Sequence, residues 1–209
     1  MLTNKNMFHV DNKFPHFALE TYNPKKDEIE KISLDDFSKK DLPAGKAGWV
    51  ILFFYPADFT FVCPTELLDL NKKYEEFKKL KAEIIAVSTD TVYTHKAWLE
   101  TEQLLAGLNY SMAADHNGKL SRELGIYDEE NGMAQRAVFI IDKDGILRAV
   151  EIVADKIGRN ASEILRKLKA LDFVEKNPGL VCPASWDEGQ ETISPSIKKA
   201  GKVYKDFHN

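Results

Sequence analysis

Residues 49–66 read WVILFFYPADFTFVCPTE, and this stretch decides the fold. It opens with an unbroken apolar run that holds β-branched and aromatic side chains, which is typical of a strand covered on both faces. A loop follows, and Pro64 then suits the first position of a helix, because the N–H that proline lacks would have no helical partner there. The stretch therefore predicts a buried strand, a loop and a helix, with Cys63 at the start of the helix.

Outward from this stretch, the apolar patterns predict helices that alternate with strands. Helices are expected at residues 64–83, 91–105, 118–125 and 160–177, the last with Asn160 or Ser162 as its N-cap. Strands are expected at residues 83–89 and 109–115, in a hairpin over 136–153 that turns at Asp144-Gly145, and at an edge of the sheet within 14–24.

This order of elements predicts an α/β protein with a thioredoxin-like fold. Its central mixed β-sheet is expected to run parallel through the crossovers and antiparallel through the hairpin, with helices on its flanks. The loop before Cys63 then lies at the carboxyl end of a central strand, where open α/β sheets usually place their sites. We predict a thioredoxin-like domain over residues 1–177 and a Pro- and Gly-rich C-terminal arm over 178–209, which carries Cys182.

The composition is that of a globular protein with a sizeable core, because 44% of the 209 residues are hydrophobic and 30% are charged. The net charge of -4, with basic residues interleaved among acidic ones, argues against nucleic acid as a partner. The N-terminus has no continuous apolar segment, and the run 49–55 is too short to span a membrane. We therefore expect a cytoplasmic protein, in which a cysteine is more often free or catalytic than part of a permanent disulfide.

Cys63 is the centre of the candidate site. A thiol at a helix start lies near unpaired N–H groups and the positive end of the helix dipole, which favour the thiolate, the nucleophilic form. Thr60 can direct its hydroxyl toward the same pocket, and Pro56 can limit the access of water. The alternative is an inert buried cysteine, since free cysteine is among the most buried residue types.

No cofactor or metal site is expected. The two cysteines form no CxxC pair, and the five histidines have no metal-ligand spacing. No phosphate-binding loop or dinucleotide-binding glycine motif is present in the sequence, so neither a nucleotide nor a flavin is indicated.

The segment FYPADFTFVCPTE resembles the signature of the peroxiredoxins, PxxxTxxC after a buried strand. Further segments resemble the family and follow in the same order along the chain: EIIAVSTD, HKAW, RAVFIIDKDGILR and VCPASW. The resemblance therefore covers roughly residues 10–195. VCPASWDEG resembles the resolving-cysteine segment of the typical 2-Cys class, nearest the peroxidase subunit of bacterial alkyl hydroperoxide reductase. The resemblance implies a thiol-dependent peroxidase that reduces hydrogen peroxide and organic hydroperoxides.

The resemblance also implies a role for both cysteines. Cys63 matches the peroxidatic cysteine, which attacks the O–O bond and becomes a sulfenic acid. Cys182 matches the resolving cysteine, which forms a disulfide with the sulfenate of a partner subunit. A disulfide reductase, either thioredoxin or a dedicated flavoprotein, then restores both thiols. Head-to-tail homodimers are implied, and five of them are expected to close into a decamer.

Four further residues match functional positions of the family. Thr60 matches the hydroxyl that positions the peroxide, and Pro56 matches the shield of the pocket. Arg136 matches the arginine that faces the thiolate, and Glu66 matches the acid that holds an arginine network. From position alone, Arg136 would be a surface cation at a strand start, and Glu66 a first-turn carboxylate that stabilises the helix dipole.

Two other function classes stay open. The chain could be a redox-sensing or holdase-type binding protein, in which the thiol reports oxidation and the assembled protein, not catalysis, provides the function. A thiol-disulfide exchanger is disfavoured, because residues 63–66 read CPTE and not CxxC. LAGLNY at 105–110 and VYKDF at 203–207 depart from the GGLG and Tyr-Phe motifs of members prone to overoxidation, so we expect a flexible arm and resistance to sulfinic oxidation.

Overall fold

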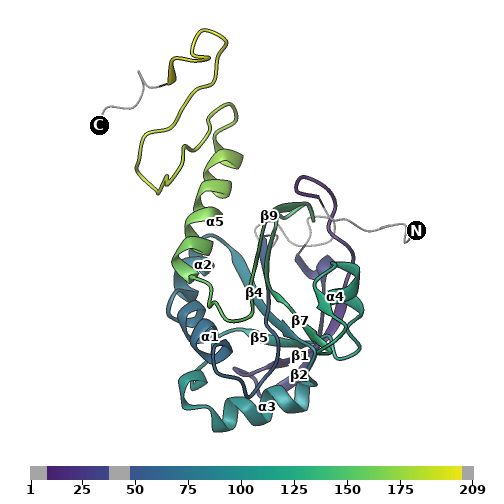
Figure 1. Cartoon of the computed structure of the whole chain (residues 1–209). Coiled ribbons are helices and arrows are strands. Elements are labelled where there is room, and N and C mark those ends of the chain that lie inside the picture. The colour runs from purple at the N-terminus through teal and green to yellow at the C-terminus, as the bar shows by residue number, and fades with distance from the viewer. Residues whose placement is uncertain (1–8, 38–47, 204–209) are drawn as a thin grey trace, which may run out of the picture. The chain divides into compact units, whose positions relative to one another are not determined.

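The computed structural model describes residues 9–37 and 48–203 (Figure 1). By its internal contacts the chain forms two compact units, Met1–Ala161 and Ser162–Asn209. The last long helix therefore falls with the arm, whereas the sequence analysis placed it in the larger domain. The predicted boundary between residues 177 and 178 stays a prediction, because compactness alone does not define a domain.

The first unit is built on one mixed seven-stranded sheet with the order β2-β1-β5-β4-β3-β8-β9. The strands β3, β4 and β5 run parallel, and the other neighbours are antiparallel. The sheet strands are β1 (Ala18–Asn23), β2 (Glu28–Ser33), β3 (Trp49–Phe54), β4 (Ala82–Ser88), β5 (Ser111–Ala114), β8 (Arg136–Ile141) and β9 (Leu147–Val153). β6 (Tyr127–Asp128) and β7 (Met133–Ala134) form a separate small hairpin.

The helices cover both faces of this sheet (Figure 1). They are α1 (Cys63–Lys72), α2 (Tyr74–Lys79), α3 (Val92–Thr101) and α4 (Lys119–Glu123), with short 3-10 turns at Leu34–Phe37 and Gln103–Leu105. Leu120 of α4 and Leu124 directly after it pack with Val50 and Leu52 of β3 on one face, while α1, α2 and α3 lie on the other. Every residue of β3 is buried, as the apolar run predicts.

Two predictions about elements are wrong. The helix expected over residues 64–83 breaks at Lys73, where φ is -100° and ψ is 0°. Apolar residues keep their helical spacing across the break, so the pattern does not reveal it. The strand within 14–24 is not at an edge, because β1 pairs with β5 on one side and with β2 on the other. No residue of β2 is buried, and its sequence EIEKIS is mostly polar, so a search for apolar runs does not predict this strand.

The predicted hairpin is confirmed as β8 and β9. Gly145 has a positive φ of 71°, which the turn requires and which glycine adopts without strain. The side chain of Asp142 also accepts the backbone N–H groups of Asp144 and Ile146, both within 2.9 Å. The mixed sheet and this hairpin confirm the predicted fold class.

The second unit consists of the helix α5 (Ala161–Lys176) from Ser162 onward and the arm. Because α5 begins at Ala161, Asn160 and not Ser162 occupies the N-cap position. Trp186 of the arm is 1% exposed, and its ring centroid lies 5.0 Å from that of Phe173 on α5. The arm is therefore folded onto α5 within this unit. Residues 204–207 of the VYKDF segment lie outside the described residues.

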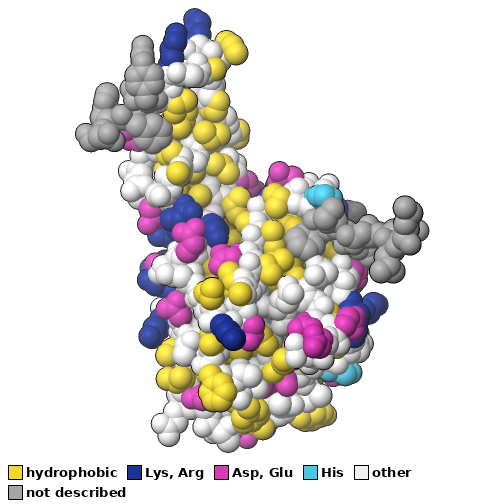
Figure 2. Space-filling model, viewed as in Figure 1, with side chains coloured by type: hydrophobic (Ala, Val, Ile, Leu, Met, Phe, Trp, Pro, Cys, Tyr) yellow, Lys and Arg dark blue, Asp and Glu magenta, His cyan; other side chains and the backbone are white. Residues whose placement is uncertain are grey.

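On the face drawn in Figure 2, Lys and Arg side chains are interspersed with Asp and Glu. Among the residues that the structure describes, no helix has both the length and the apolar character needed to cross a membrane.

Candidate active site

Cys63 is the first residue of α1, and its side chain is buried. Val62 occupies the N-cap position without a side-chain hydrogen bond, and the N–H groups of Thr65 and Glu66 bond to its carbonyl oxygen. Because α1 starts at Cys63, the sulfur lies at the positive end of the helix dipole, which favours a negative charge there. The predicted placement of the thiol at a helix start is confirmed.

Arg136 reaches this sulfur from the neighbouring strand. β8 runs antiparallel to β3, with Ala137 opposite Phe54, so the first residue of β8 lies beside the end of β3. Arg136 Nη1 donates to Cys63 Sγ at 3.2 Å and to a Glu66 carboxylate oxygen at 2.8 Å. Burial lowers the pKa of Arg136, but its contacts with Cys63 and Glu66 outweigh burial, so the pKa lies above its ordinary value. Arg136 is therefore not a surface cation.

Glu66 links this arginine to a second one, Arg159, which the sequence analysis missed. Its carboxylate accepts Arg159 Nε–H at 2.9 Å, Nη2–H at 3.0 Å and the backbone N–H at 2.8 Å. Arg159 Nη1 donates to the carbonyl oxygen of Ala137, and its guanidinium lies 3.5 Å from the ring centroid of Phe53. Burial lowers the pKa of Arg159 below its ordinary value, and Glu66 opposes this effect. Nothing in the local sequence IGRN distinguishes this arginine.

The loop between β3 and α1 carries Pro56 and Thr60. Pro56 is buried. The Thr60 hydroxyl donates to the carbonyl oxygen of Ala57 at 2.8 Å, which leaves the lone pairs of Oγ1 as acceptors. Its predicted role in positioning a peroxide stays a prediction.

A buried polar network that the sequence analysis also missed supports this loop. The Tyr55 hydroxyl donates to Asp58 Oδ1 at 2.7 Å, and His95 Nδ1 lies 2.8 Å from Asp58 Oδ2. His95 Nε2 faces the carbonyl oxygen of Ala113 at 3.2 Å. Both ring nitrogens of His95 thus have an oxygen partner, which fixes the orientation of the ring. Burial raises the pKa of Asp58, although His95 and Tyr55 act in the opposite direction.

A cavity of about 500 Å³ opens beside the site. Arg136, which contacts the sulfur, lines this cavity together with Pro56. The remaining lining comes from the β6–β7 hairpin, the residues before β8 and the end of β9. Residues 9–37 and 48–203 contain no group of three His, Cys, Asp or Glu side chains arranged to hold a metal ion.

Cys182 lies in the second unit and is partly exposed. Its Sγ lies 3.9 Å from the carbonyl oxygen of Ala170 on α5. Burial raises the pKa of its thiol, while the positive charge of Arg166 works in the opposite direction. Arg166 Nη1 also donates to the carbonyl oxygen of Trp186 at 2.9 Å, so the segment that carries Cys182 is tied to α5.

Comparison with known families shows which family the chain belongs to. The model of the AhpC/TSA family matches residues 10–150, and the model of the C-terminal domain of 1-Cys peroxiredoxin matches residues 170–206. The chain belongs to the AhpC/TSA family. The second match includes Cys182, so this AhpC/TSA chain has a second thiol within a segment named for the one-cysteine class.

Relatives and solved structures agree with this AhpC/TSA membership. Alkyl hydroperoxide reductase C of Staphylococcus epidermidis and that of Staphylococcus aureus are each 44% identical over 194 residues, 93% of this chain and 98% of the relative. Reduced 2-Cys peroxiredoxin of Plasmodium vivax has a TM-score of 0.85 at 30% identity and covers 95% of this chain and 98% of its own. AhpC of Enterococcus faecalis has a TM-score of 0.76 at 40% identity, over 85% of this chain and 100% of its own.

These likenesses confirm the resemblance to the peroxiredoxins and the predicted class of enzyme. This AhpC/TSA protein is a thiol-dependent peroxidase, and a redox-sensing or holdase-type binding protein is not favoured.

Proposed function

We propose that Cys63 is the peroxidatic residue, and that it reduces hydrogen peroxide and organic hydroperoxides. The observation that carries this proposal is the position of Cys63 Sγ, at the start of α1 and 3.2 Å from Arg136 Nη1. A helix start and a guanidinium both favour the thiolate, which is the nucleophile. The names of the staphylococcal relatives support hydroperoxides as the substrates.

In the first step the thiolate attacks one peroxide oxygen, and an S–O bond forms as the O–O bond breaks. Cys63 becomes a sulfenic acid, and the leaving oxygen takes a proton to give water or an alcohol. Arg136 is placed to donate to a peroxide oxygen, since its guanidinium is always charged and offers several donors. In this proposal Thr60 Oγ1 accepts the peroxide O–H, and Pro56 limits the access of water. Glu66 and Arg159 hold Arg136 in this orientation.

In the second step the thiol of Cys182 from a partner subunit attacks the sulfenic sulfur. An S–S bond forms, and the hydroxyl group leaves as water with the thiol proton. An external reductase, thioredoxin or a dedicated flavoprotein, then supplies two electrons and two protons to restore both thiols. The two free cysteines, and the resemblance of VCPASWDEG to the resolving-cysteine segment, support this cycle. Homodimers that assemble into a decamer, and a cytoplasmic setting, remain parts of this proposal.

The test is the stopped-flow reaction of the reduced protein with hydrogen peroxide, followed by tryptophan fluorescence. We expect a second-order reaction far faster than that of an ordinary thiol. Cys63→Ser should abolish it, and Cys182→Ser should leave the first step intact and accumulate the sulfenic acid, which a dimedone adduct in mass spectrometry detects. A fast reaction that survives in Cys63→Ser would contradict the proposal.

A further inference from the structure

The cavity beside the site has an apolar wall. Met133 and Ala134 of β7 form one part of it, and Ile152 and Val153 at the end of β9, with Ala154 directly after them, form the other. Ile152 is 44% exposed, so this wall presents carbon atoms toward solvent. Burying apolar surface is favourable by roughly 25 cal/mol per Å², so the wall suits a small organic group more than it suits water.

Carboxylates lie at the same cavity as Arg136. Asp155 Oδ1 lies 3.2 Å from Arg136 Nη2, and the Asp155 side chain is 74% exposed. Asp128 also lines the cavity. Hydrogen bonds from Asn131 and Glu130 lower the pKa of Asp128, so this group is negatively charged at neutral pH.

The guanidinium of Arg136 has few N–H groups left for a substrate. Nη1 donates to Cys63 Sγ and to Glu66, and Nε donates to the backbone carbonyl oxygen of Asp155 at 2.5 Å. These bonds use three of the five N–H groups that an arginine offers. The remaining two are on Nη2, the atom that the Asp155 carboxylate contacts. Asp155 therefore adds a negative charge at the nitrogen that is left for a bound oxygen.

We propose that Asp155 makes the site select neutral organic hydroperoxides over anionic ones. Its carboxylate, together with Asp128, offsets the positive charge of Arg136 at the cavity, and the apolar wall receives the organic group. A hydroperoxide that carries its own carboxylate meets two negative charges there and is disfavoured. The inference rests on the proposed function, because it concerns the approach of a hydroperoxide to Cys63.

The experiment uses two hydroperoxides that differ in one charge, para-carboxy cumene hydroperoxide and its methyl ester. Second-order rate constants are measured by stopped flow for the reduced full-length protein, and the readout is the ratio of the ester rate to the acid rate. We expect the wild-type protein to prefer the ester. Asp155→Asn should lower this ratio by about five-fold, the order expected for one unit charge at a few ångströms in a water-like dielectric. The effect should shrink as salt is added.

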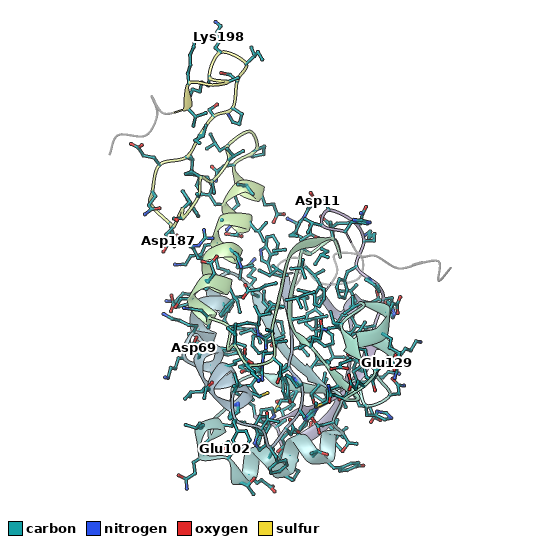
Figure 3. All side chains as sticks on the ribbon, viewed as in Figure 1. Asp11, Asp69, Glu102, Glu129, Asp187 and Lys198 are labelled. Atoms are coloured by element: carbon teal, nitrogen blue, oxygen red, sulfur yellow. The ribbon has the colours of Figure 1, made fainter. Side chains whose placement is uncertain are left out.

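Two variants serve as controls. Asp155→Glu keeps the charge and should retain the wild-type ratio. Asp11→Asn removes a carboxylate, labelled in Figure 3, that is 72% exposed and lies 2.7 Å from Arg148 of β9. Neither Asp11 nor Arg148 lines the cavity. Asp11→Asn should leave both rates unchanged.

The results separate this inference from the proposed function. A wild-type ratio near one, or a ratio that Asp155→Asn leaves unchanged, would overturn the role of Asp155. Slow reaction of the wild-type protein with hydrogen peroxide and with both organic probes would instead contradict the proposed function of Cys63. A lowered ratio in Asp155→Asn that Asp155→Glu restores would support the inference.

Discussion

At the scale of single residues, Glu66 is the group on which the site depends most. It lies between two arginines, and its carboxylate is buried together with their guanidinium groups. Removing one partner of a buried ion pair leaves an uncompensated buried charge, which typically costs 3–5 kcal/mol. Glu66 thus stabilises the dipole of α1 from its first turn and also binds both arginines.

We predict that Glu66→Ala lowers the free energy of unfolding by about 3–5 kcal/mol and slows the reaction of Cys63 with peroxide, because both guanidiniums lose their shared acceptor. Urea unfolding and stopped flow measure the two effects. Glu163→Ala is a matched control, since Glu163 accepts Arg166 at 2.7 and 2.9 Å on α5 where the pair is partly exposed. A Glu66→Ala protein as stable as this control would contradict the prediction.

Asp58 gives a prediction about pH. Its pKa is raised above the ordinary value of 3.8 in the folded protein, mainly by burial. Between that value and the raised pKa, the folded state holds a proton that the unfolded state has released. The contribution of Asp58 to stability is therefore full below about pH 4 and declines as pH rises through the raised pKa.

The measurement is urea unfolding of the wild-type protein and Asp58→Asn across this range of pH. The stability of the wild-type protein relative to Asp58→Asn should fall as the pH rises. A difference that grows with pH would show that the carboxylate is stabilised in its charged form, contrary to this prediction.

At the scale of elements, the arm is held more firmly than its composition suggests. Pro and Gly in residues 178–209 predict flexibility, yet Trp186 packs on Phe173 and donates its indole N–H to the carbonyl oxygen of Gln190 at 3.1 Å. The loop 105–110 is likewise held, because Asn71 of α1 accepts the backbone N–H of Asn109 at 2.9 Å. The predicted resistance to sulfinic oxidation stays a prediction.

We predict that Trp186→Ala releases the segment around Cys182 from α5. Loss of a buried aromatic side chain typically costs 3–5 kcal/mol, here as local stability of the second unit. Amide hydrogen exchange at residues 181–190 should become faster. Less sulfinic acid should form on Cys63 at a given peroxide dose, because Cys182 leaves its place by Ala170 more readily and is free to react with the sulfenic acid. Val203→Ala, at a partly exposed apolar position, is the control. Unchanged exchange in Trp186→Ala would show that the indole does not hold the segment.

The sequence predicts the elements well where apolar residues are continuous. β3 and the hairpin of β8 and β9 have long apolar runs, and both are confirmed. β2 is missed because none of the residues of this outer strand is buried. The break at Lys73 is missed because it leaves the helical spacing of the apolar residues unchanged. Cys63 and Arg136 were placed together by family resemblance. Arg159 and His95 were missed because their roles arise from contacts with residues far away in the sequence, Glu66 for Arg159 and Asp58 for His95.

At the scale of the whole molecule, the proposed cycle links two units of the chain that each carry one thiol. We predict that peroxide converts the protein to a disulfide-linked dimer on a non-reducing gel, because Cys182 is expected to react with Cys63 of a second subunit. Cys182→Ser should migrate as a monomer after the same treatment, and dithiothreitol should return the wild-type protein to a monomer. Migration of the oxidised wild-type protein as a monomer would contradict a disulfide between subunits.

The stacking of Arg159 on Phe53 has a consequence for the thermal inactivation of this enzyme. Phe53 belongs to the central strand, and through Arg159 and Glu66 it is joined by direct contact to the arginine beside the sulfur. The reactive cluster is thus continuous with the interior of the sheet. Heat should therefore not abolish the reaction of Cys63 with peroxide while the sheet stays folded. Loss of this reaction and loss of the native circular dichroism signal should follow the same curve.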